Sequence, residues 1–238
     1  MLQWYDFLSS ARGIVSADDV RRLTDVYVDG YRRLLRDVLP SDKNSRIYDT
    51  GCGPGLTLNI LRTLGYRNME GTDLSATAVG IACELGLNVI QANSIENLEA
   101  HPDGSFSRIF AVDLIEHLEK PDLIRFLSVA RTKLSLHDGF LILRCPNGDS
   151  PIVGRHLFND VTHVWTYTST ALAGLLMMSG FKSVSFLDET APFVNSRRWL
   201  RTPILKISST FIRLLIKAAT KENIEILAPS FWIVAKAS

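Results

Sequence analysis

Short apolar stretches alternate with stretches of helical periodicity along most of the chain, and this alternation restricts the fold more than any other feature. Several helical stretches end at a glycine, as at Gly65, Gly86 and Gly180. Such alternation predicts a mostly parallel α/β sheet with helices on both faces. Strands are expected at 46–49, 68–72, 88–91, 108–112, 140–143, 182–187 and 231–235, and helices at 56–64, 75–85, 121–134, 169–178 and 205–219.

The residues before this alternation are expected to form a helical cap. Ser16 stands three residues before Asp19, an arrangement that resembles a capping box, and apolar residues then recur at helical spacing. The chain of 238 residues suits one α/β domain with additions better than two full domains. We therefore expect a cap at 1–45 and a single domain at 46–238.

Composition and charge exclude several classes of protein. The formal net charge is +1, so there is no overall electrostatic attraction to nucleic acid. Cys52, Cys83 and Cys145 are far apart and form no CxxC pair, which indicates neither a disulfide framework nor a zinc site. We recognise no secretory signal, and no apolar stretch reaches the roughly 18 residues of a spanning helix. A cytoplasmic location is therefore expected.

The most specific segment is Asp49–Gly55, which follows the first expected strand. Its glycines at 51, 53 and 55 allow a sharp turn and the close approach of a ligand to the backbone. The spacing differs from the G-x-G-x-x-G of dinucleotide-binding proteins, and no G-K-[ST] follows as in a P-loop. In open α/β sheets ligands bind at this place, and a loop this tight suits a nucleoside without a pyrophosphate.

A second acidic residue supports a nucleoside site. Asp73 lies 24 residues after Asp49, at the end of the second expected strand. A carboxylate in this position can accept hydrogen bonds from both ribose hydroxyls. Taken alone, either aspartate could equally cap a turn or a helix, but the glycine loop beside them favours ligand binding.

Four segments together resemble the class I S-adenosylmethionine-dependent methyltransferases. Asp49–Gly55 is similar to their motif I, Gly71–Ser75 to the acidic ribose loop, Gln91–Ser94 to the adenine loop, and Ala111–Leu118 to the motif after the fourth strand. The resemblance implies a Rossmann-like seven-stranded sheet whose last strand is antiparallel. It also implies S-adenosylmethionine as cofactor and S-adenosylhomocysteine as product. The implied cofactor contacts are Asp49, Gly51, Cys52, Gly53, Gly55, Asp73, Leu74, Asn93, Ser94, Asp113 and Leu114.

A narrower resemblance lies further along the chain. Segments 146–151, 159–163, 167–168 and 179–181 look like a bacterial subgroup associated with cell-surface glycan biosynthesis. In that subgroup a glutamate often follows the Thr-His pair, whereas Val164 stands there in this chain. The resemblance implies O-methylation of a hydroxyl on a glycan or a lipid-linked sugar. Two alternatives stay open: another small acceptor such as a phenol or an amine, and a cofactor-binding scaffold without catalysis.

Methyl transfer to a hydroxyl benefits from a general base with a pKa near neutrality, which points to histidine. His163 is the first candidate, because it is expected in a loop at the carboxyl edge of the sheet beside Asp160. His117 is the second, four residues after Asp113. Each histidine could instead have a structural role. We expect no metal-dependent mechanism, since we recognise no cluster of Asp and Asn residues typical of a metal site outside the cofactor motifs.

The segment at 197–221 is expected to be an amphipathic helical insertion with a basic stripe. It contains seven basic residues and no acidic one. A wide apolar face with a basic stripe is typical of a helix that lies on an anionic membrane surface, here the inner face of the membrane. Packing on the sheet or in a homodimer interface is the other interpretation. The basic residues are Arg197, Arg198, Arg201, Lys206, Arg213, Lys217 and Lys221.

Overall fold

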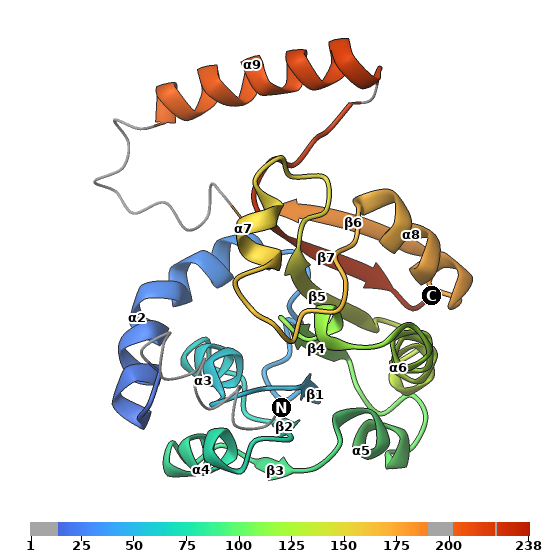
Figure 1. Cartoon of the computed structure of the whole chain (residues 1–238). Coiled ribbons are helices and arrows are strands. Elements are labelled where there is room, and N and C mark those ends of the chain that lie inside the picture. The colour runs from blue at the N-terminus through green and yellow to red at the C-terminus, as the bar shows by residue number, and fades with distance from the viewer. Residues whose placement is uncertain (1–13, 190–201, 222) are drawn as a thin grey trace.

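The computed structural model contains one seven-stranded sheet with helices on both faces (Figure 1). It describes residues 14–189, 202–221 and 223–238, with the side chains of 202–206 also outside the description. The strand order is β3-β2-β1-β4-β5-β7-β6. The strands are β1 (Ile47–Thr50), β2 (Met69–Asp73), β3 (Val89–Gln91), β4 (Arg108–Val112), β5 (Phe140–Pro146), β6 (Ser183–Asp188) and β7 (Ser230–Lys236).

The directions of the strands agree with the predicted sheet. β1 pairs in parallel with β2 and β4, β2 with β3, and β4 with β5. The last strand, β7, runs antiparallel to both of its neighbours, β5 and β6. The Rossmann-like sheet with an antiparallel final strand is therefore confirmed. Because β1, β2 and β4 are parallel, their carboxyl ends lie at one edge of the sheet.

Alternate strand residues pack into opposite layers of the core, as the two-residue period of a strand requires. Ile109 and Ala111 of β4 belong to a cluster with α5, α6 and α8, whereas Phe110 packs with α2 and α3. The first layer comprises α5 (Ser94–Ala100), α6 (Lys120–Lys133) and α8 (Ser169–Met178). The second comprises α2 (Ala17–Leu34), α3 (Leu56–Thr63) and α4 (Ala76–Glu84).

Three short helices were not expected from the sequence. They are α5, the 3-10 helix η1 (Ile115–His117) and α7 (Val153–Leu157). The expected helix near the C-terminus is α9 (Thr202–Thr220), which lies apart from the sheet in Figure 1. Of the predicted segments 1–45 and 197–221, residues 1–13 and 197–201 lie outside the described residues.

The cap helix α2 begins as its sequence predicts and packs on the sheet domain. Ser16 is the N-cap, and its side chain accepts a hydrogen bond from the Asp19 N–H. On the inner face, the Asn59 side chain donates to Thr24 Oγ1 at 2.7 Å, and Tyr31 is buried. This buried contact joins α2 to α3. The domain boundary at residue 45 remains a prediction.

A buried asparagine holds the long connection that follows β5. Asn147 is fully buried, and its Nδ2 donates to the carbonyl oxygens of Ile226 at 2.8 Å and Ala228 at 2.9 Å. Its Oδ1 accepts from the Asp149 N–H at 2.9 Å. The amide thus ties the start of this connection to the segment before β7. Both donors and the acceptor of the side chain are used.

We expect Asn147→Asp to destabilise the protein more than Asn147→Ala. An ionised carboxylate would face two carbonyl oxygens, whereas alanine only removes the hydrogen bonds. The expected losses are about 3–5 kcal/mol for aspartate and about 1–3 kcal/mol for alanine. Urea denaturation at neutral pH measures both. Equal losses, or a smaller loss with aspartate, would contradict the assignment of Nδ2 to the two carbonyls.

Candidate active site

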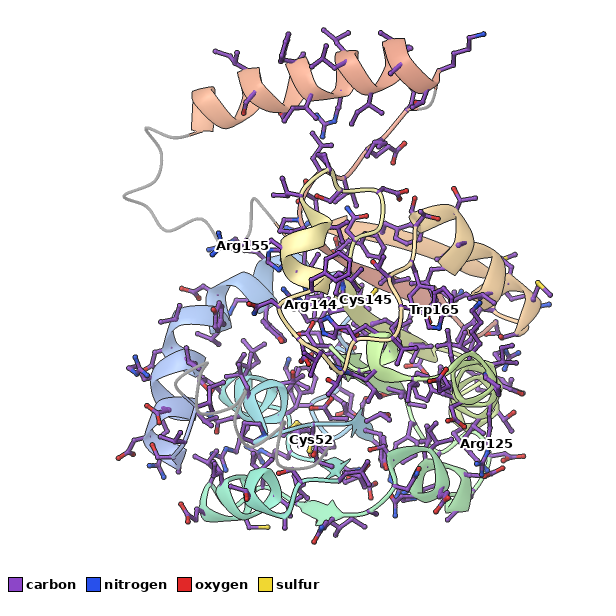
Figure 2. The ribbon with its side chains drawn as sticks, in the orientation of Figure 1. Cys52, Arg125, Arg144, Cys145, Arg155 and Trp165 are labelled. Atoms are coloured by element: carbon purple, nitrogen blue, oxygen red, sulfur yellow. The ribbon has the colours of Figure 1, made fainter. Side chains whose placement is uncertain are left out.

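The segments that resemble cofactor-binding motifs come together at the carboxyl ends of β1, β2 and β4. In register, Asp49 of β1 lies beside Gly71 of β2 and Phe110 of β4. Cys52, labelled in Figure 2, lies just beyond β1. Its N–H donates to the Thr72 carbonyl, and its side chain is buried in the core. Any ligand contact of Cys52 would therefore involve its backbone carbonyl.

The three glycines of the loop after β1 are required for different reasons. All have positive φ, at 66° for Gly51, 54° for Gly53 and 84° for Gly55. A Cβ on Gly51 would lie 2.8 Å from Leu114 Cδ1, and one on Gly55 would lie 2.5 Å from Leu87 Cδ1. A Cβ on Gly53 would meet no atom within 4 Å. The backbone of Gly53 is thus open to a ligand.

The carboxylates of Asp73 and Asp49, which lie near this loop, differ in their hydrogen bonding. Asp73 Oδ2 accepts from the Gly53 N–H and its Oδ1 from the Ser75 N–H, both at 2.8 Å. Asp49 is 1% exposed, and neither of its carboxylate oxygens has a hydrogen-bond partner among the described residues. Burial raises the pKa of Asp49 well above its usual range, and the charge of Asp73 adds to this. A cationic ligand would satisfy this carboxylate.

Asn93 and Ser94 have structural roles that the sequence did not indicate. Asn93 is the N-cap of α5, and its Oδ1 accepts from the N–H groups of Ile95 and Glu96. Ser94 Oγ accepts from the Gly51 N–H at 3.2 Å. The side-chain carbonyl of Asn93, expected to accept from an adenine amine, is therefore already engaged by the helix that it caps.

Asp113 follows β4 in a conformation that non-glycine residues seldom adopt, with φ at 53°. Its carboxylate forms an ion pair with Arg144 of β5, which also pairs with Glu189. Burial opposes the charge of Arg144, but the two carboxylates outweigh it and raise the pKa of the guanidinium well above its usual range. Leu114, the next residue, packs against the glycine loop. The segment after β4 therefore touches both the loop and β5.

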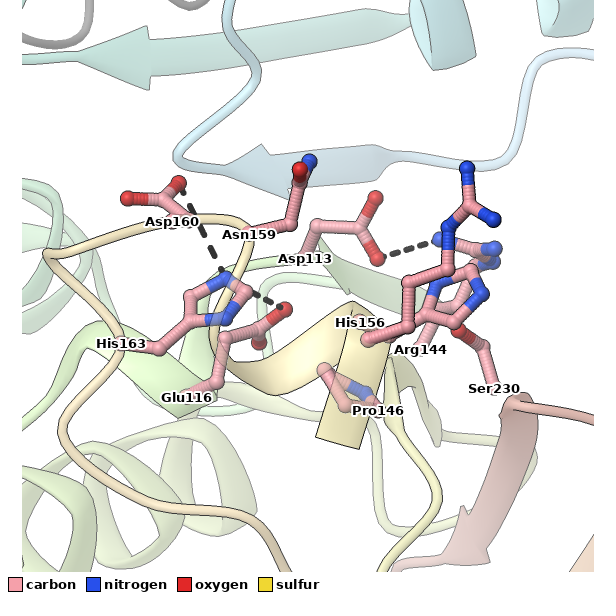
Figure 3. Close-up of a pocket in the computed structure, with 10 residues that line it drawn as sticks. Asp113, Glu116, Arg144, Pro146, His156, Asn159, Asp160, His163 and Ser230 are labelled. Carbon is pink, nitrogen blue, oxygen red and sulfur yellow. Dashed lines mark hydrogen bonds and ion pairs between the residues drawn. The ribbon is translucent and has the colours of Figure 1, made fainter. Parts of the chain in front are cut away.

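Beside Asp113 lies a cavity of about 340 Å³ (Figure 3). Except for Pro146, every residue that lines it is polar or charged. Arg144 of β5 and Arg155 of α7 both line it, and Figure 3 shows Arg144 beside Asp113. The lining residues are Asp113, Glu116, Arg144, Pro146, Arg155, His156, Asn159, Asp160, His163 and Ser230.

The structure brings the two predicted catalytic histidines together. The ring centroids of His117 and His163 are 4.7 Å apart. His163 Nε2 lies 3.8 Å from Asp160 Oδ2 and 4.0 Å from Glu116 Oε1, as Figure 3 shows. Burial lowers the pKa of His117, and the charge of His163 lowers it further. The general-base role expected for His163 stays a prediction.

Hydrogen bonds hold this pair in place. Asp160 Oδ1 accepts from the backbone N–H of Thr162 at 2.9 Å and from its hydroxyl at 2.6 Å. The Thr162 hydroxyl lies 2.9 Å from His117 Nδ1. The Glu116 carbonyl accepts from the Val164 N–H at 2.8 Å, which fastens the His163 loop onto η1. Val164 thus helps to hold the His163 loop through its backbone N–H rather than through its side chain.

Of the nine polar or charged residues that line this cavity, only Asp113 and His163 were predicted site residues; Glu116 and Arg144 are two of the seven that were not. Glu116 precedes His117 directly, and this Glu-His pair after a buried strand was the available signal. Arg144 is a charged residue in the otherwise apolar strand β5, which is also visible in the sequence. That Glu116 and Arg144 line one cavity depends on the positions of loops, which no local sequence pattern predicts.

Comparisons with known proteins identify the family. The sequence matches the family described as Methyltransferase domain over residues 21–185. O-methyltransferase rstn1 of Aspergillus nomiae is 27% identical over 185 residues, covering 72% of this chain and 80% of that protein. A ubiquinone biosynthesis O-methyltransferase of Xanthomonas euvesicatoria is 32% identical over 85 residues, covering 34% of this chain and 35% of that relative.

Solved structures show the same fold. A SAM dependent methyltransferase from Archaeoglobus fulgidus superposes with a TM-score of 0.67 at 20% sequence identity, covering 90% of this chain and 94% of that one. Because the family match spans more than half of the chain, the protein belongs to the methyltransferase-domain family. It is an S-adenosylmethionine-dependent methyltransferase with a Rossmann-like fold.

The buried carboxyl of Asp49 predicts a pH dependence of stability. Its pKa is raised in the folded protein, so the unfolded chain loses this proton first as the pH rises. The contribution of Asp49 to stability therefore falls with rising pH, from the unfolded pKa up to the folded one. We expect Asp49→Asn to flatten this fall in urea denaturation between about pH 5 and pH 8. If the free energy of unfolding changes with pH in the same way for the variant and the unmodified protein, Asp49 does not cause this pH dependence.

Proposed function

We propose that this methyltransferase O-methylates a hydroxyl of a glycan or of a lipid-linked sugar. The observation that carries the proposal is the lining of the cavity beside Asp113, where nine of the ten residues are polar or charged. A sugar offers many hydroxyls to such groups, whereas a phenol would need an apolar or aromatic surface for its ring. The two similar proteins named above are both O-methyltransferases, which supports an oxygen acceptor.

The cofactor is proposed to lie over the glycine loop. Asp73 would bind the ribose hydroxyls, and the backbone of Gly53 leaves room for the ligand. Leu74 is 52% exposed directly after Asp73, which suits an apolar side chain that covers the adenine. Gly51, Gly55, Ser94 and Leu114 shape the loop. Asp49 and Asp113 would face the positively charged methionine part.

The cofactor supplies an activated methyl group on a sulfonium, so the protein must place and activate the acceptor. Asp113 lines the cavity and follows β4, so the cavity adjoins the proposed cofactor position. His163 and His117 are proposed to activate the acceptor hydroxyl, because the His163 side chain lines this cavity and the His117 ring lies beside it, with 4.7 Å between the ring centroids. Asp160 and Thr162 position the His117 ring through the hydrogen bonds described above.

The proposal is tested with purified protein, labelled S-adenosylmethionine and a panel of glycans, phenols and amines. Label should pass to a glycan hydroxyl. His163→Ala should lower turnover by about 10²–10⁴-fold while its affinity for S-adenosylhomocysteine stays the same. Gly53→Ala should instead weaken cofactor binding. Its Cβ would project into the open space above the loop, where the cofactor is proposed to lie. Calorimetry measures both affinities.

Transfer only to phenols or amines would refute the acceptor class, and absence of any transfer would leave a binding scaffold. Full activity of His163→Ala would show that this histidine is structural. His137→Ala provides the matched control, since His137 is exposed in the turn before β5. It should change neither turnover nor affinity.

We also propose that α9 places the enzyme on an anionic membrane surface, where a lipid-linked acceptor would be found. Among the described side chains of α9, four large apolar ones are more than half exposed: Ile207, Phe211, Leu214 and Leu215. Lys217 and Lys221 are also exposed. No helix in the described part of the chain is long and apolar enough to cross a membrane.

Arg213 is less suited to lipid contact than its sequence position suggests. Its guanidinium donates to the carbonyl oxygens of Ile224 and Glu225, which ties α9 to the segment that leads to β7. A charge reversal at Arg213 would disturb the helix itself. Lys217 and Lys221 are therefore the residues to change.

Lys217→Glu combined with Lys221→Glu should weaken binding to anionic vesicles by about 30-fold, since each basic residue contributes about 1 kcal/mol. Arg67→Glu with Lys182→Glu makes the same change in net charge at exposed sites elsewhere and should have little effect. Sedimentation with anionic and neutral vesicles measures binding. Equal binding to both vesicle types, or a concentration-dependent dimer without vesicle binding, would refute membrane docking.

A further inference from the structure

Four donor groups from two distant segments converge at one wall of the cavity. Glu116 and His117 belong to η1, and Asp160 and His163 belong to the loop after α7. Glu116, His117 and His163 each offer a ligand atom, and these atoms all lie within 4.8 Å of one another. The side chains of His163 and Glu116 are only 6% and 1% exposed. This set is buried and preassembled, unlike an acidic patch at the surface.

The hydrogen bonds of His163 determine which of its ring nitrogens can bind a ligand. Its Nδ1 lies 2.9 Å from the Leu157 carbonyl oxygen, which can only accept. Nδ1 therefore carries a hydrogen, and the lone pair of the neutral ring is on Nε2. That lone pair is directed at the carboxylates of Glu116 and Asp160. Two carboxylates that face this nitrogen attract a positive charge, which either a proton on Nε2 or a cation placed between the three groups supplies.

The same argument applies to His117. Its Nδ1 lies 2.9 Å from the Thr162 hydroxyl, whose hydrogen is donated to Asp160. It also lies 3.3 Å from the Thr162 carbonyl, which can only accept. Nδ1 of His117 is therefore a donor, and its lone pair is also on Nε2. Histidines that bind metals characteristically donate their other ring N–H to a carbonyl or to an oriented polar group.

We propose that Glu116, His117 and His163 bind a divalent first-row transition-metal ion, with Asp160 Oδ2 as a fourth ligand or a partner of bound water. Two imidazoles and a carboxylate are a ligand set typical of zinc and related ions. Ligand bonds of about 2.0–2.2 Å place neighbouring donors roughly 3–4 Å apart. Because the donor atoms lie within 4.8 Å of one another, the widest pair would have to approach by up to roughly 1–2 Å.

This inference rests on the proposed function and gives His163 the role of a metal ligand. An ion at the wall of the acceptor cavity lowers the pKa of a hydroxyl bound to it. The hydroxyl proton passes to water, and the oxygen forms a bond to the methyl carbon of S-adenosylmethionine. The carbon–sulfur bond breaks, and the sulfur keeps the electron pair. The products are a methyl ether and S-adenosylhomocysteine.

The experiment titrates Zn²⁺ and Mn²⁺ into the full chain after treatment with a chelator, followed by calorimetry. One ion should bind per chain. Glu116→Gln and His163→Ala should each weaken binding by more than roughly 100-fold. Thr162→Val, which removes the hydroxyl that orients His117, should weaken it by about 10–100-fold. His156 lines the same cavity but is not part of the cluster, so His156→Ala should bind the metal ion as tightly as the unmodified protein does.

Retained affinity for S-adenosylhomocysteine shows that each variant is folded. The proposal is overturned if the unmodified protein binds neither ion, or if His156→Ala weakens binding as much as His163→Ala. Full methyl transfer after chelation would overturn the metal site and leave the methyltransferase proposal intact. Stoichiometric ion binding without methyl transfer to any hydroxyl would support the metal site and overturn the proposed O-methylation.

Discussion

The carboxylate of Asp73 holds two turns of the chain together, and the cofactor side of the site depends on it. One oxygen accepts from the loop after β1 and the other from the start of α4. Ser94 adds a hydrogen bond to Gly51 in the same loop. The turn is therefore fixed before any ligand arrives, and the open space above Gly53 is a consequence of this arrangement. Such preorganisation lowers the cost of ordering a loop on binding.

Most of the fold could be predicted because its signals are local. The predicted strand at 108–112 and helix at 169–178 coincide with β4 and α8, where apolar periodicity and the flanking residues agree. The short helices α5 and α7 were missed because seven and five residues are too few to show a helical period. Asn93 illustrates the consequence. It is expected as a cofactor contact, and the structure shows that it is also the N-cap of a helix that the sequence did not reveal.

The site divides into a part that the sequence predicts and a part that it does not. The glycine loop and Asp73 follow directly from strand ends and turn chemistry, so their proximity was predictable. The contact between His117 and Thr162 joins positions 45 residues apart through the hydroxyl and the backbone carbonyl of the threonine. It requires the turn that Asp160 makes with Thr162 and the backbone bond from Val164 to Glu116. Only the tertiary structure shows that the two candidate histidines are neighbours.

The electrostatics of the two halves of the site are suited to a reaction that changes the charge of the cofactor. Asp49 is buried, and burial strengthens its attraction for a positive charge placed beside it. The sulfonium of S-adenosylmethionine carries such a charge, and S-adenosylhomocysteine does not. In the proposed arrangement, a cofactor over Gly53 would lose attraction to Asp49 when the methyl group leaves. The carboxylate that costs stability in the free protein would then favour the substrate form of the cofactor over its product.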